Sequence, residues 1–346
     1  MMENFAELIT LSGAPGSPYT RKLLAVLRYR RLAYRWITRR QIAEANLPKA
    51  KVPLMPTVYR PGPDGIQPVT DTTPLIRTLE AEHSGRSVIP DDPVMRLVDA
   101  LLEDYADEWL TKAMFHYRWV YRADIEQSTV MLPLWFDPHR PDDVIEADGA
   151  AFANRQIERL HVVGSSPETA PLIEASYRRF LEAMNTHLTN HRFLAGERPG
   201  AADFAAFGQL TQLATFDPTP MAMTLDVAPR IYAWVTFVED LTGVEPSPAD
   251  WFTRDTCPGT LRALLAEAGR SYVPVMLANA RAVRDSEPTF SLTLDGAEWA
   301  QRTFPYQAKC VRWLREDYAA LSADDREAFD GLLAGTGCGA LFTSEI

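Results

Sequence analysis

The chain has 346 residues, of which 46% are hydrophobic and 23% are charged. This length and balance favour a soluble globular protein with room for two or three domains. The 46 acidic residues outnumber the 35 lysines and arginines, which gives a formal net charge of −11 at pH 7. Such a charge repels nucleic acid and acidic membrane surfaces, so we expect neither as a partner.

The cysteines and histidines indicate neither a disulfide scaffold nor a metal site. The three cysteines are widely spaced and include no CxxC pair, which favours a reducing compartment. The six histidines form no HExxH motif, so we expect no metal. The first residues lack the basic segment of a secretory signal, and no run of about 18 apolar residues is present. We therefore predict a cytoplasmic protein.

The first part of the chain predicts alternating strands and helices. Residues 7–11 form a β-prone run that ends in a cluster of turn formers, after which Tyr19 begins a helical pattern. Leucines spaced three to four residues apart mark one buried face of this helix, while basic residues, Lys22 among them, occupy the rest of it. Ser17 lies where a side chain normally caps the free amides, and Pro18 lies where the first turn tolerates a missing N–H.

A second strand and a turn-rich hairpin follow. The strand is expected at residues 33–37, and the hairpin strands at 56–60 and 66–70 flank a turn rich in proline and glycine. A further helix starts at Asp71. The predicted order β-α-β-(α)-β-β, followed by a helix, indicates an α/β domain.

From Pro93 onward the pattern changes to long amphipathic helices. Further helices are expected at residues 168–190, 199–215 and 228–242. A loop is expected at residues 218–220, between the last two of them. A proline-rich break then introduces residues 246–346, which we expect to be mostly helical. Within this stretch, residues 289–294 before Asp295-Gly296 predict one β-hairpin arm.

Ser17 is the first position at which chemistry could occur. A hydroxyl at a helix N-terminus can donate to a bound anion, and the free amides and the helix dipole add positive potential. A cysteine thiol has a pKa near about 8.5, so such a site could stabilise its thiolate at neutral pH. The alternative is that Ser17 is only an N-cap, which contributes about 1 kcal/mol of stability.

Two more positions could bind a peptide-like ligand. At Met55-Pro56 a cis bond would turn the backbone of Met55 toward an open edge, although Pro53 competes for this role. At Asp71-Thr72 a carboxylate and a hydroxyl at a helix start could bind an amino group and a carboxylate. The alternatives are a trans proline that starts an edge strand and an ordinary capping pair.

These three positions, in this order and at this spacing, resemble the glutathione S-transferase superfamily over roughly residues 7–245. Ser17-Pro18-Tyr19-x-Arg21 is similar to the helix start of its serine-type and omega-like classes, with the arginine one place early. Residues 193–204 resemble a second family segment, Phe-Leu-x-Gly-x-x-x-Ser/Thr-x-Ala-Asp. There Gly200 replaces the capping hydroxyl, which leaves only Asp203 to contribute.

The resemblance implies a thioredoxin-like α/β domain that binds glutathione and an all-helical domain that holds the second substrate. We expect these domains at residues 1–86 and 90–245, with a mostly helical C-terminal extension at 246–346. Ser17 would contact the glutathione sulfur. Met55-Pro56 would bind the cysteinyl backbone, and Asp71-Thr72 the γ-glutamyl group. The resemblance also implies a homodimer formed through the N-terminal domain and the first long helix.

Further candidates are less specific. Glutathione carries two carboxylates, so Tyr19 and the cations Arg39 and Lys51 are expected at its site, although these cations could simply be solvated. Four acidic residues on the first long helix form two pairs at helical spacing, Glu103, Asp104, Asp107 and Glu108. They are either a solvent-facing run or an acid/base pair, and the resemblance makes Asp104 a candidate for the glutathione amino group. Aromatic residues beyond them could wall an apolar pocket for the second substrate: Trp109, His116 and Trp119.

The leading hypothesis is a glutathione transferase in which a serine-stabilised thiolate attacks a small, apolar electrophile. Glutathione would be its co-substrate, and no metal is required. One alternative is a non-catalytic binding or scaffold protein of the same fold, which the extension favours. Another is a glutathione-dependent lyase or isomerase, which would share the site.

Overall fold

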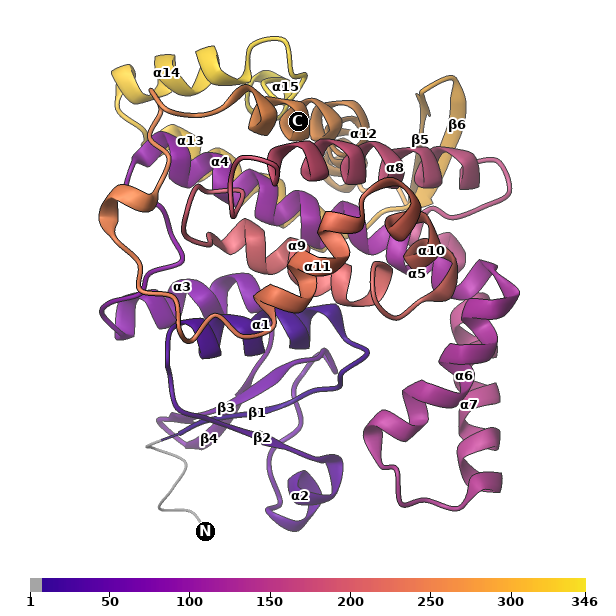
Figure 1. Ribbon diagram of the computed structural model, residues 1–346. Coiled ribbons are helices and arrows are strands. Elements are labelled where there is room, and N and C mark those ends of the chain that lie inside the picture. The colour runs from indigo at the N-terminus through magenta and orange to yellow at the C-terminus, as the bar shows by residue number, and fades with distance from the viewer. Residues whose placement is uncertain (1–7) are drawn as a thin grey trace.

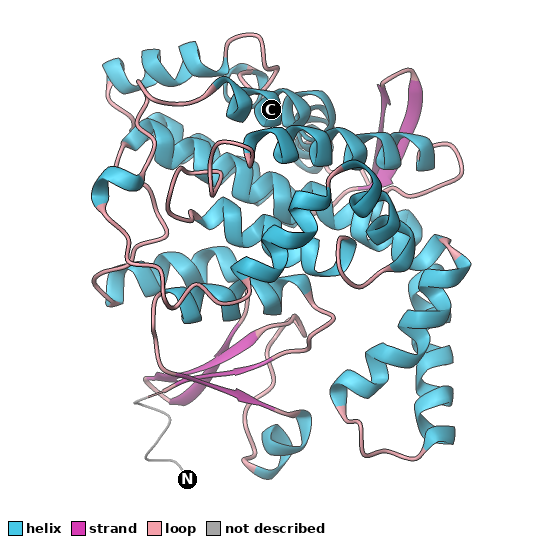
Figure 2. Cartoon of the chain, in the orientation of Figure 1, coloured by secondary structure: helices cyan, strands magenta, loops and turns pink. Residues whose placement is uncertain are grey.

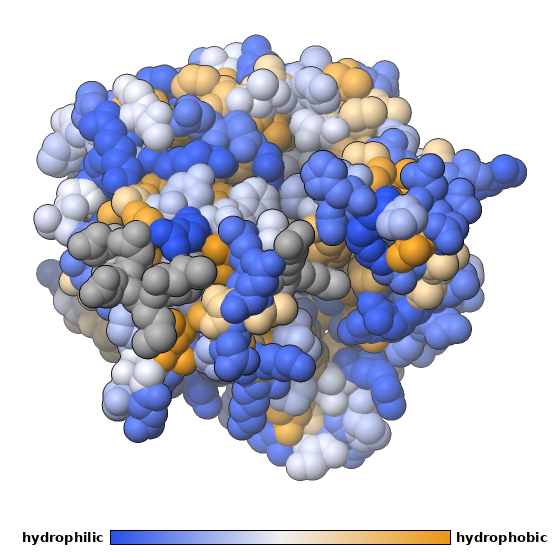
Figure 3. All heavy atoms as spheres, turned by 90° about the horizontal axis from the view of Figure 1, so that it is seen from below, coloured by the Kyte–Doolittle hydropathy of each residue, from blue (hydrophilic) through white to orange (hydrophobic). Residues whose placement is uncertain are grey.

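The computed structural model describes residues 8–346, apart from the side chains of residues 39 and 40. Figure 1 shows a small sheet domain below a large helical body. No helix in the described residues is long and apolar enough to cross a membrane. Seen from below, the surface is mainly hydrophilic, with apolar residues scattered over it (Figure 3).

The N-terminal domain confirms the predicted order of strands and helices. Its elements are β1 (Ile9–Ser12), α1 (Pro18–Tyr29), β2 (Tyr34–Ile37), α2 (Arg39–Glu44), β3 (Thr57–Gly62), β4 (Gly65–Val69) and α3 (Thr72–Glu82). The sheet order is β2-β1-β3-β4, with β1 parallel to β2 and antiparallel to β3. Helices α1 and α3 lie between this sheet and the helical body (Figure 1). The start of α1 therefore faces both domains.

The helical body follows α3. It comprises α4 (Pro93–Tyr105), the π-helical turn η2 (Ala106–Leu110), α5 (Thr111–Val120), α6 (Arg122–Phe136), α7 (Asp142–Ile157), the short turn η3 (Leu160–Val163), α8 (Ala170–His187), α9 (Ala201–Leu213), α10 (Pro218–Val227) and α11 (Pro229–Val238). The expectation of a loop at residues 218–220 is wrong, because α10 begins at Pro218. Proline fits this first position, where no N–H donor is needed.

The start of α9 shows how the missing hydroxyl at Gly200 is replaced. Asp203 accepts from the N–H of Gly200 at 2.9 Å, as expected. The carboxylate of Asp99 on α4 accepts from the next two amides, those of Ala201 and Ala202, at 3.2 and 3.1 Å. A Cβ at position 200 would lie 2.2 Å from Asp99 Oδ1. Glycine therefore makes room for a cap supplied by another helix.

The extension confirms the mostly helical expectation and the hairpin arm. Its elements are η4 (Pro248–Asp250), α12 (Gly259–Arg284), the hairpin β5 (Thr289–Leu294) and β6 (Ala297–Arg302), α13 (Pro305–Ala320), α14 (Ala323–Leu333) and α15 (Ala340–Thr343). Figure 2 shows the hairpin as the only strands drawn outside the N-terminal sheet in the described chain. Helix α12 packs on α8, while α13 and α14 pack on α4.

The extension shares its core with the helical body. One cluster of buried apolar residues runs from α4 and α9 through α12 to α14, and it includes Leu101, Phe207, Leu265 and Phe329. A separate, smaller cluster fills the space between the sheet, α1 and α3. The predicted boundaries at residues 86, 90 and 245 remain predictions. The continuous core nevertheless means that α12–α15 are packed as part of the helical body.

Candidate active site

Ser17 caps α1 and faces the strand that follows Pro56. The Thr20 N–H donates to Ser17 Oγ at 3.2 Å, and the Ser17 hydroxyl donates to the Met55 carbonyl at 3.5 Å. Its side chain is half-buried. The structure thus brings together the first two positions that the sequence singled out.

The Met55–Pro56 peptide bond is cis. Of the two prolines considered, Pro56 therefore has the cis bond, and it directly precedes β3. Met55 is 38% exposed, and its carbonyl lies beside the Ser17 hydroxyl.

Asp71 lies at the start of α3 in an unusual backbone conformation. Its φ of 81° places a non-glycine residue in the left-handed region, which such residues rarely occupy outside functional or tightly determined positions. Its carboxylate accepts a hydrogen bond from the Tyr306 hydroxyl at 2.9 Å. Burial raises the pKa of the Asp71 carboxyl, and Tyr306 and Lys309 oppose this rise. Thr72 is buried in the first turn of α3.

Tyr306 was not anticipated from the sequence. It belongs to α13 and lies 235 residues after Asp71. Nothing in the local pattern around either residue signals this contact.

The other expected glutathione contacts have different surroundings. The Tyr19 hydroxyl donates to the Asp107 carbonyl at 2.8 Å, so it joins α1 to η2. Lys51 is exposed in the connection before Pro56. Arg39 begins α2, but its side chain lies outside the described part of the chain.

A buried ion-pair network connects α1, α3 and α4. Lys22, which the helical pattern placed on the polar face of α1, is fully buried. Its ammonium donates to Glu103 at 2.8 Å and to Asp107 at 2.5 Å, and Arg77 donates to the other oxygen of Glu103 at 2.7 Å. Burial alone would raise the pKa of Glu103, but Arg77 and Lys22 outweigh this effect and lower it to about 2. The solvent-facing interpretation of these acidic residues is therefore wrong.

The two remaining acidic residues of this run face the extension. Asp104 accepts from the Tyr272 hydroxyl of α12, and Glu108 accepts from the Gln307 amide of α13 at 2.9 Å. Burial raises the pKa of Asp104 to about 7. Burial, with the nearby charge of Asp104, raises the pKa of Glu108 to about 8. The side chains that donate hydrogen bonds to Asp104 and Glu108 are therefore neutral, whereas those that donate to Glu103 are cations.

The three aromatic candidates for the substrate pocket are enclosed between helices. Trp109 donates to Ser176 at 2.7 Å and packs against Trp299 of the hairpin, with ring centroids 5.4 Å apart. His116 is fully buried and bonded to Ser165 and Glu174. Trp119 is buried in a small cluster with α7.

An apolar wall that the sequence did not indicate lies beside the start of α1. A Cβ at Gly16 would lie 2.4 Å from Leu132 and 3.0 Å from Trp135, both on α6. The Trp135 ring packs on Phe216 with centroids 4.5 Å apart. Helix α6 therefore places apolar side chains next to the residue that precedes Ser17.

The helical body also holds the loop before Ser17 in place. Gln212 of α9 donates to the Pro15 carbonyl at 3.1 Å, and Arg118 of α5 donates to the Gly16 carbonyl at 3.2 Å. The buried Arg118 guanidinium is paired with Asp217 at 2.9 Å. These bonds fix the approach of the loop to the helix N-terminus.

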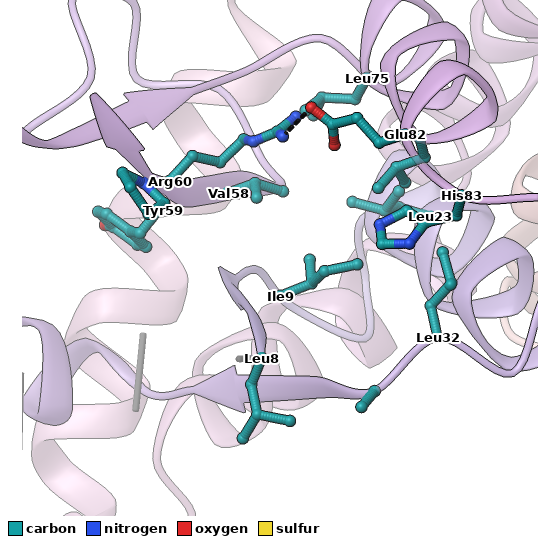
Figure 4. A pocket seen from close by; sticks show the side chains of 13 residues that line it. Leu8, Ile9, Leu23, Leu32, Val58, Tyr59, Arg60, Leu75, Glu82 and His83 are labelled. Carbon is teal, nitrogen blue, oxygen red and sulfur yellow. Dashed lines mark hydrogen bonds and ion pairs between the residues drawn. The ribbon is translucent and has the colours of Figure 1, made fainter. Parts of the chain in front are cut away.

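Two cavities lie outside this arrangement. One, of about 260 Å³, is lined mainly by apolar residues of β1, β3, α1 and α3, with the Arg60–Glu82 ion pair at its edge (Figure 4). The other, of about 350 Å³, lies between α3, α4 and α13 and is lined by Thr73, Asp104 and Trp313 among others. Neither is lined by Ser17.

Three comparisons with known proteins bear on this geometry. The family model for the glutathione S-transferase N-terminal domain matches residues 11–87, and the model for the C-terminal domain matches residues 146–236. A search of curated proteins found no match.

Solved structures that match this chain include several from bacteria. A glutathione transferase family member from Pseudomonas fluorescens, with two glutathione molecules bound, is 13% identical; the match covers 67% of this chain and 88% of that one, with a TM-score of 0.42. A glutathione S-transferase from Rhodospirillum rubrum is 16% identical, with coverages of 72% and 98% and a TM-score of 0.40. FzlA from C. crescentus is 16% identical, with coverages of 75% and 92% and a TM-score of 0.42.

The matched segments contain the positions described above. Ser17, Pro56, Asp71 and Thr72 lie in the first segment, and Asp203 lies in the second. Together with the thioredoxin-like sheet and the all-helical body, these two matches show the glutathione S-transferase fold, with its N-terminal domain matched over residues 11–87 and its C-terminal domain over residues 146–236.

Proposed function

We propose that this chain is a glutathione transferase in which Ser17 donates a hydrogen bond to the glutathione thiolate. The observation that carries this proposal is the position of the Ser17 hydroxyl, at the N-terminus of α1 and 3.5 Å from the Met55 carbonyl. The amides of the first turn and the helix dipole add positive potential there. Together they lower the pKa of a bound thiol from about 8.5 and so populate the nucleophile.

The proposed reaction joins glutathione to a small, apolar electrophile. The thiolate forms a carbon–sulfur bond, and the electron pair of the bond that breaks leaves with the departing group or moves onto a neighbouring atom. Leu132 and Trp135 of α6 lie next to Gly16, and we propose that they form the near wall of the electrophile site. Trp109, His116 and Trp119 are enclosed in helix packing, so they would shape this site from behind.

Glutathione would bind along the edge between Ser17 and Asp71. Met55-Pro56 would bind its cysteinyl backbone, while Asp71 and Thr72 would bind the γ-glutamyl ammonium and carboxylate. Lys51, Arg39 and Tyr19 remain proposed contacts. Asp104 is engaged by Tyr272, so a direct role for it in binding the amino group requires that bond to open.

The test is the Ser17→Ala variant with 1-chloro-2,4-dinitrobenzene as the electrophile. We expect kcat to fall by at least about tenfold, because the donor to the thiolate is lost. The Kd for glutathione should change by less than about threefold, since most binding contacts remain. Unchanged turnover in a folded variant would overturn the proposal.

A matched control separates chemistry from capping. Ser17→Ala also removes the N-cap bond to Thr20, which costs about 1 kcal/mol of stability. Ser17→Thr keeps both the cap and the hydroxyl, so it should retain most of the activity. Thermal unfolding of both variants shows whether lost turnover follows from lost stability.

The alternative is a protein of this fold that binds partners without catalysis. Its supporting observation is the extension, whose α13 reaches Asp71. Retention on immobilised glutathione with elution by free glutathione distinguishes the two functions. A glutathione-dependent lyase or isomerase would share the Ser17 site, and a screen of electrophiles against isomerisable substrates separates it from a transferase.

Homodimerisation and a cytoplasmic location are also proposals. Helix α4 is already covered by α13 and α14 of the same chain. A dimer that formed on this side would therefore have to pack against the outer face of the extension. Light scattering of the purified full chain measures its mass directly.

A further inference from the structure

Helix α13 is attached to the helical body through side chains of its first three turns. Gln307 donates to the buried Glu108 at 2.9 Å, and Cys310, Val311 and Leu314 are buried against the shared core. The side chains on its first turns are therefore held at fixed positions relative to α3 and α4.

The first turns of α13 present two polar side chains to the start of α3. The Tyr306 hydroxyl donates to Asp71 at 2.9 Å. Lys309 lies three residues after Tyr306 and so on the same face of α13. Its ammonium lies 4.2 Å from the Trp313 ring centroid and 5.7 Å from that of Tyr306, and its charge opposes the rise in the pKa of Asp71. The extension thus bonds Asp71 through a hydroxyl and carries a cation on the same helix face, one turn further along.

Lys309 differs from the other lysine near Asp71. Lys22 is buried and paired with both Glu103 and Asp107, so its charge is already compensated. Lys309 is exposed, and within residues 8–346 its recorded contacts are the two aromatic rings rather than a carboxylate. It is therefore the cation at this place that can accept an anionic partner.

An amino acid head group carries an ammonium and a carboxylate on the same carbon atom. A complementary site needs an anion and a cation side by side, each able to make a charge-assisted hydrogen bond. Asp71 supplies the anion and Lys309 the cation, while the aromatic rings beneath Lys309 hold it by cation–π contact.

We propose that α13 of the extension forms part of the glutathione site, with Lys309 binding the γ-glutamyl carboxylate and Tyr306 orienting Asp71 toward the ammonium. This inference rests on the proposed function of the Ser17 site. Lys309 contacts the ligand together with Thr72, whereas Tyr306 is a positioning residue that acts through Asp71. The extension then contributes to specificity for the head group.

The experiment uses glutathione and two analogues, each lacking one charge. 4-Aminobutyryl-cysteinylglycine lacks the γ-glutamyl carboxylate, and glutaryl-cysteinylglycine lacks the ammonium. We expect the full-length protein to bind each analogue about tenfold or more weakly than glutathione, as measured by calorimetry. Lys309→Met should weaken glutathione about tenfold and leave 4-aminobutyryl-cysteinylglycine unchanged, so that the preference between these two ligands disappears.

Two further variants provide controls. Arg312→Met removes an exposed cation from the same helix, where Arg312 is paired with Glu316, and it should leave all three affinities unchanged. Lys309→Arg keeps the charge and should keep most of the preference for glutathione. If Lys309→Met retains the full preference, the inference is overturned.

Tyr306 is tested by the pH profile of glutathione binding. Its hydroxyl helps to lower the pKa of Asp71, which must be ionised to bind an ammonium. Tyr306→Phe should therefore move the acid limb of the binding profile to higher pH, and the shift should vanish when Asp71→Asn is already present. An unmoved profile, or tighter binding of glutathione, would overturn the positioning role.

The failure of this inference is distinct from the failure of the proposed function. If the unmodified protein binds no glutathione, the proposed function fails and this inference fails with it. If it binds glutathione but does not distinguish the three ligands, the Ser17 proposal stands and only the role of α13 is overturned.

Discussion

The helix that runs from α4 into η2 meets the N-terminal domain and the extension in two different ways. Toward α1 and α3, Glu103 is paired with Lys22 and Arg77, and its pKa is lowered to about 2 despite burial. Toward the extension, Asp104 is half-buried and Glu108 is buried, and the side chains that donate hydrogen bonds to them are neutral. Their pKa values rise to about 7 and about 8, although the buried Lys112 opposes the rise at Glu108.

Neighbouring carboxyls on one helix thus illustrate two ways to bury an acidic side chain. An ionised carboxylate is expensive to remove from water unless a cation compensates for it, and otherwise the group keeps its proton. The N-terminal domain is joined to the body by compensated charges. Along this helix the extension is met by apolar packing and by carboxyls whose pKa values are raised, whereas elsewhere the buried Glu267 of α12 is paired with Arg179 of α8.

The largest expected effect comes from the ion-paired side. Lys22→Met leaves Glu103 and Asp107 buried without their shared cation, and we expect a loss of about 3–5 kcal/mol in the free energy of unfolding. Urea denaturation measures the loss. Adding Asp107→Asn should recover part of it, since one unpaired charge is removed; a loss below about 1 kcal/mol for Lys22→Met would contradict the comparison.

A second prediction compares close backbone contacts in the two regions. A Cβ at Gly208 of α9 would lie 2.5 Å from the Pro18 carbonyl of α1, and one at Gly269 of α12 would lie 2.0 Å from the Thr336 carbonyl. Each alanine substitution should destabilise the protein by about 1–3 kcal/mol. Only Gly208→Ala displaces the helix that Ser17 caps, so it should lower turnover in addition. Equal effects of both variants on turnover would mean that the position of α1 is not what limits the reaction.

The smallest effect is expected on the extension side at low pH. At pH 4 Glu108 is largely protonated in both the folded and the unfolded state, so Glu108→Gln should change stability by less than about 1 kcal/mol there. An unfolded glutamate has a pKa near about 4.3. The folded protein therefore retains a proton that the unfolded chain releases, and stability from this group falls as pH rises from about 4 to about 8.

The Glu108→Gln substitution removes this dependence of stability on pH. We expect Glu108→Gln to become more stable than the unmodified protein as the pH is raised to 9, as measured by thermal unfolding across the pH range. Glu103→Gln is the matched control, because its carboxylate is ionised and paired. It should be destabilised at pH 6 and pH 9 alike, and parallel pH curves for Glu108→Gln and the unmodified protein would refute the contrast.

Local patterns were sufficient to predict the N-terminal elements. The strands, the hairpin and the cap at Ser17 depend on turn residues and alternation within a few positions, and the structure has them in the predicted order. The β-hairpin of the extension was found for the same reason, because Asp295-Gly296 marks its turn.

Contacts between distant segments could not be predicted in this way. The leucine spacing places Lys22 on the polar face of α1. Its burial could not be predicted, because its partner Glu103 lies 81 residues further along the chain. The same limit hid the Asp99 cap at Gly200 and the bond between Tyr306 and Asp71. The wall formed by Leu132 and Trp135 also depends on how α6 folds back over Gly16.

The π-helical turn η2 has a consequence for how the two sides of the molecule are aligned. A π turn accommodates one residue more than an α turn, and each residue of an α-helix turns the chain by about 100°. Removing one residue from η2 would therefore rotate α5 by roughly that angle relative to α4. Arg118, which holds the Gly16 carbonyl, would then point away from the loop before Ser17. The extra residue of η2 therefore sets the angle about the helix axis between α4, which meets the extension, and α5, which supports the loop before Ser17.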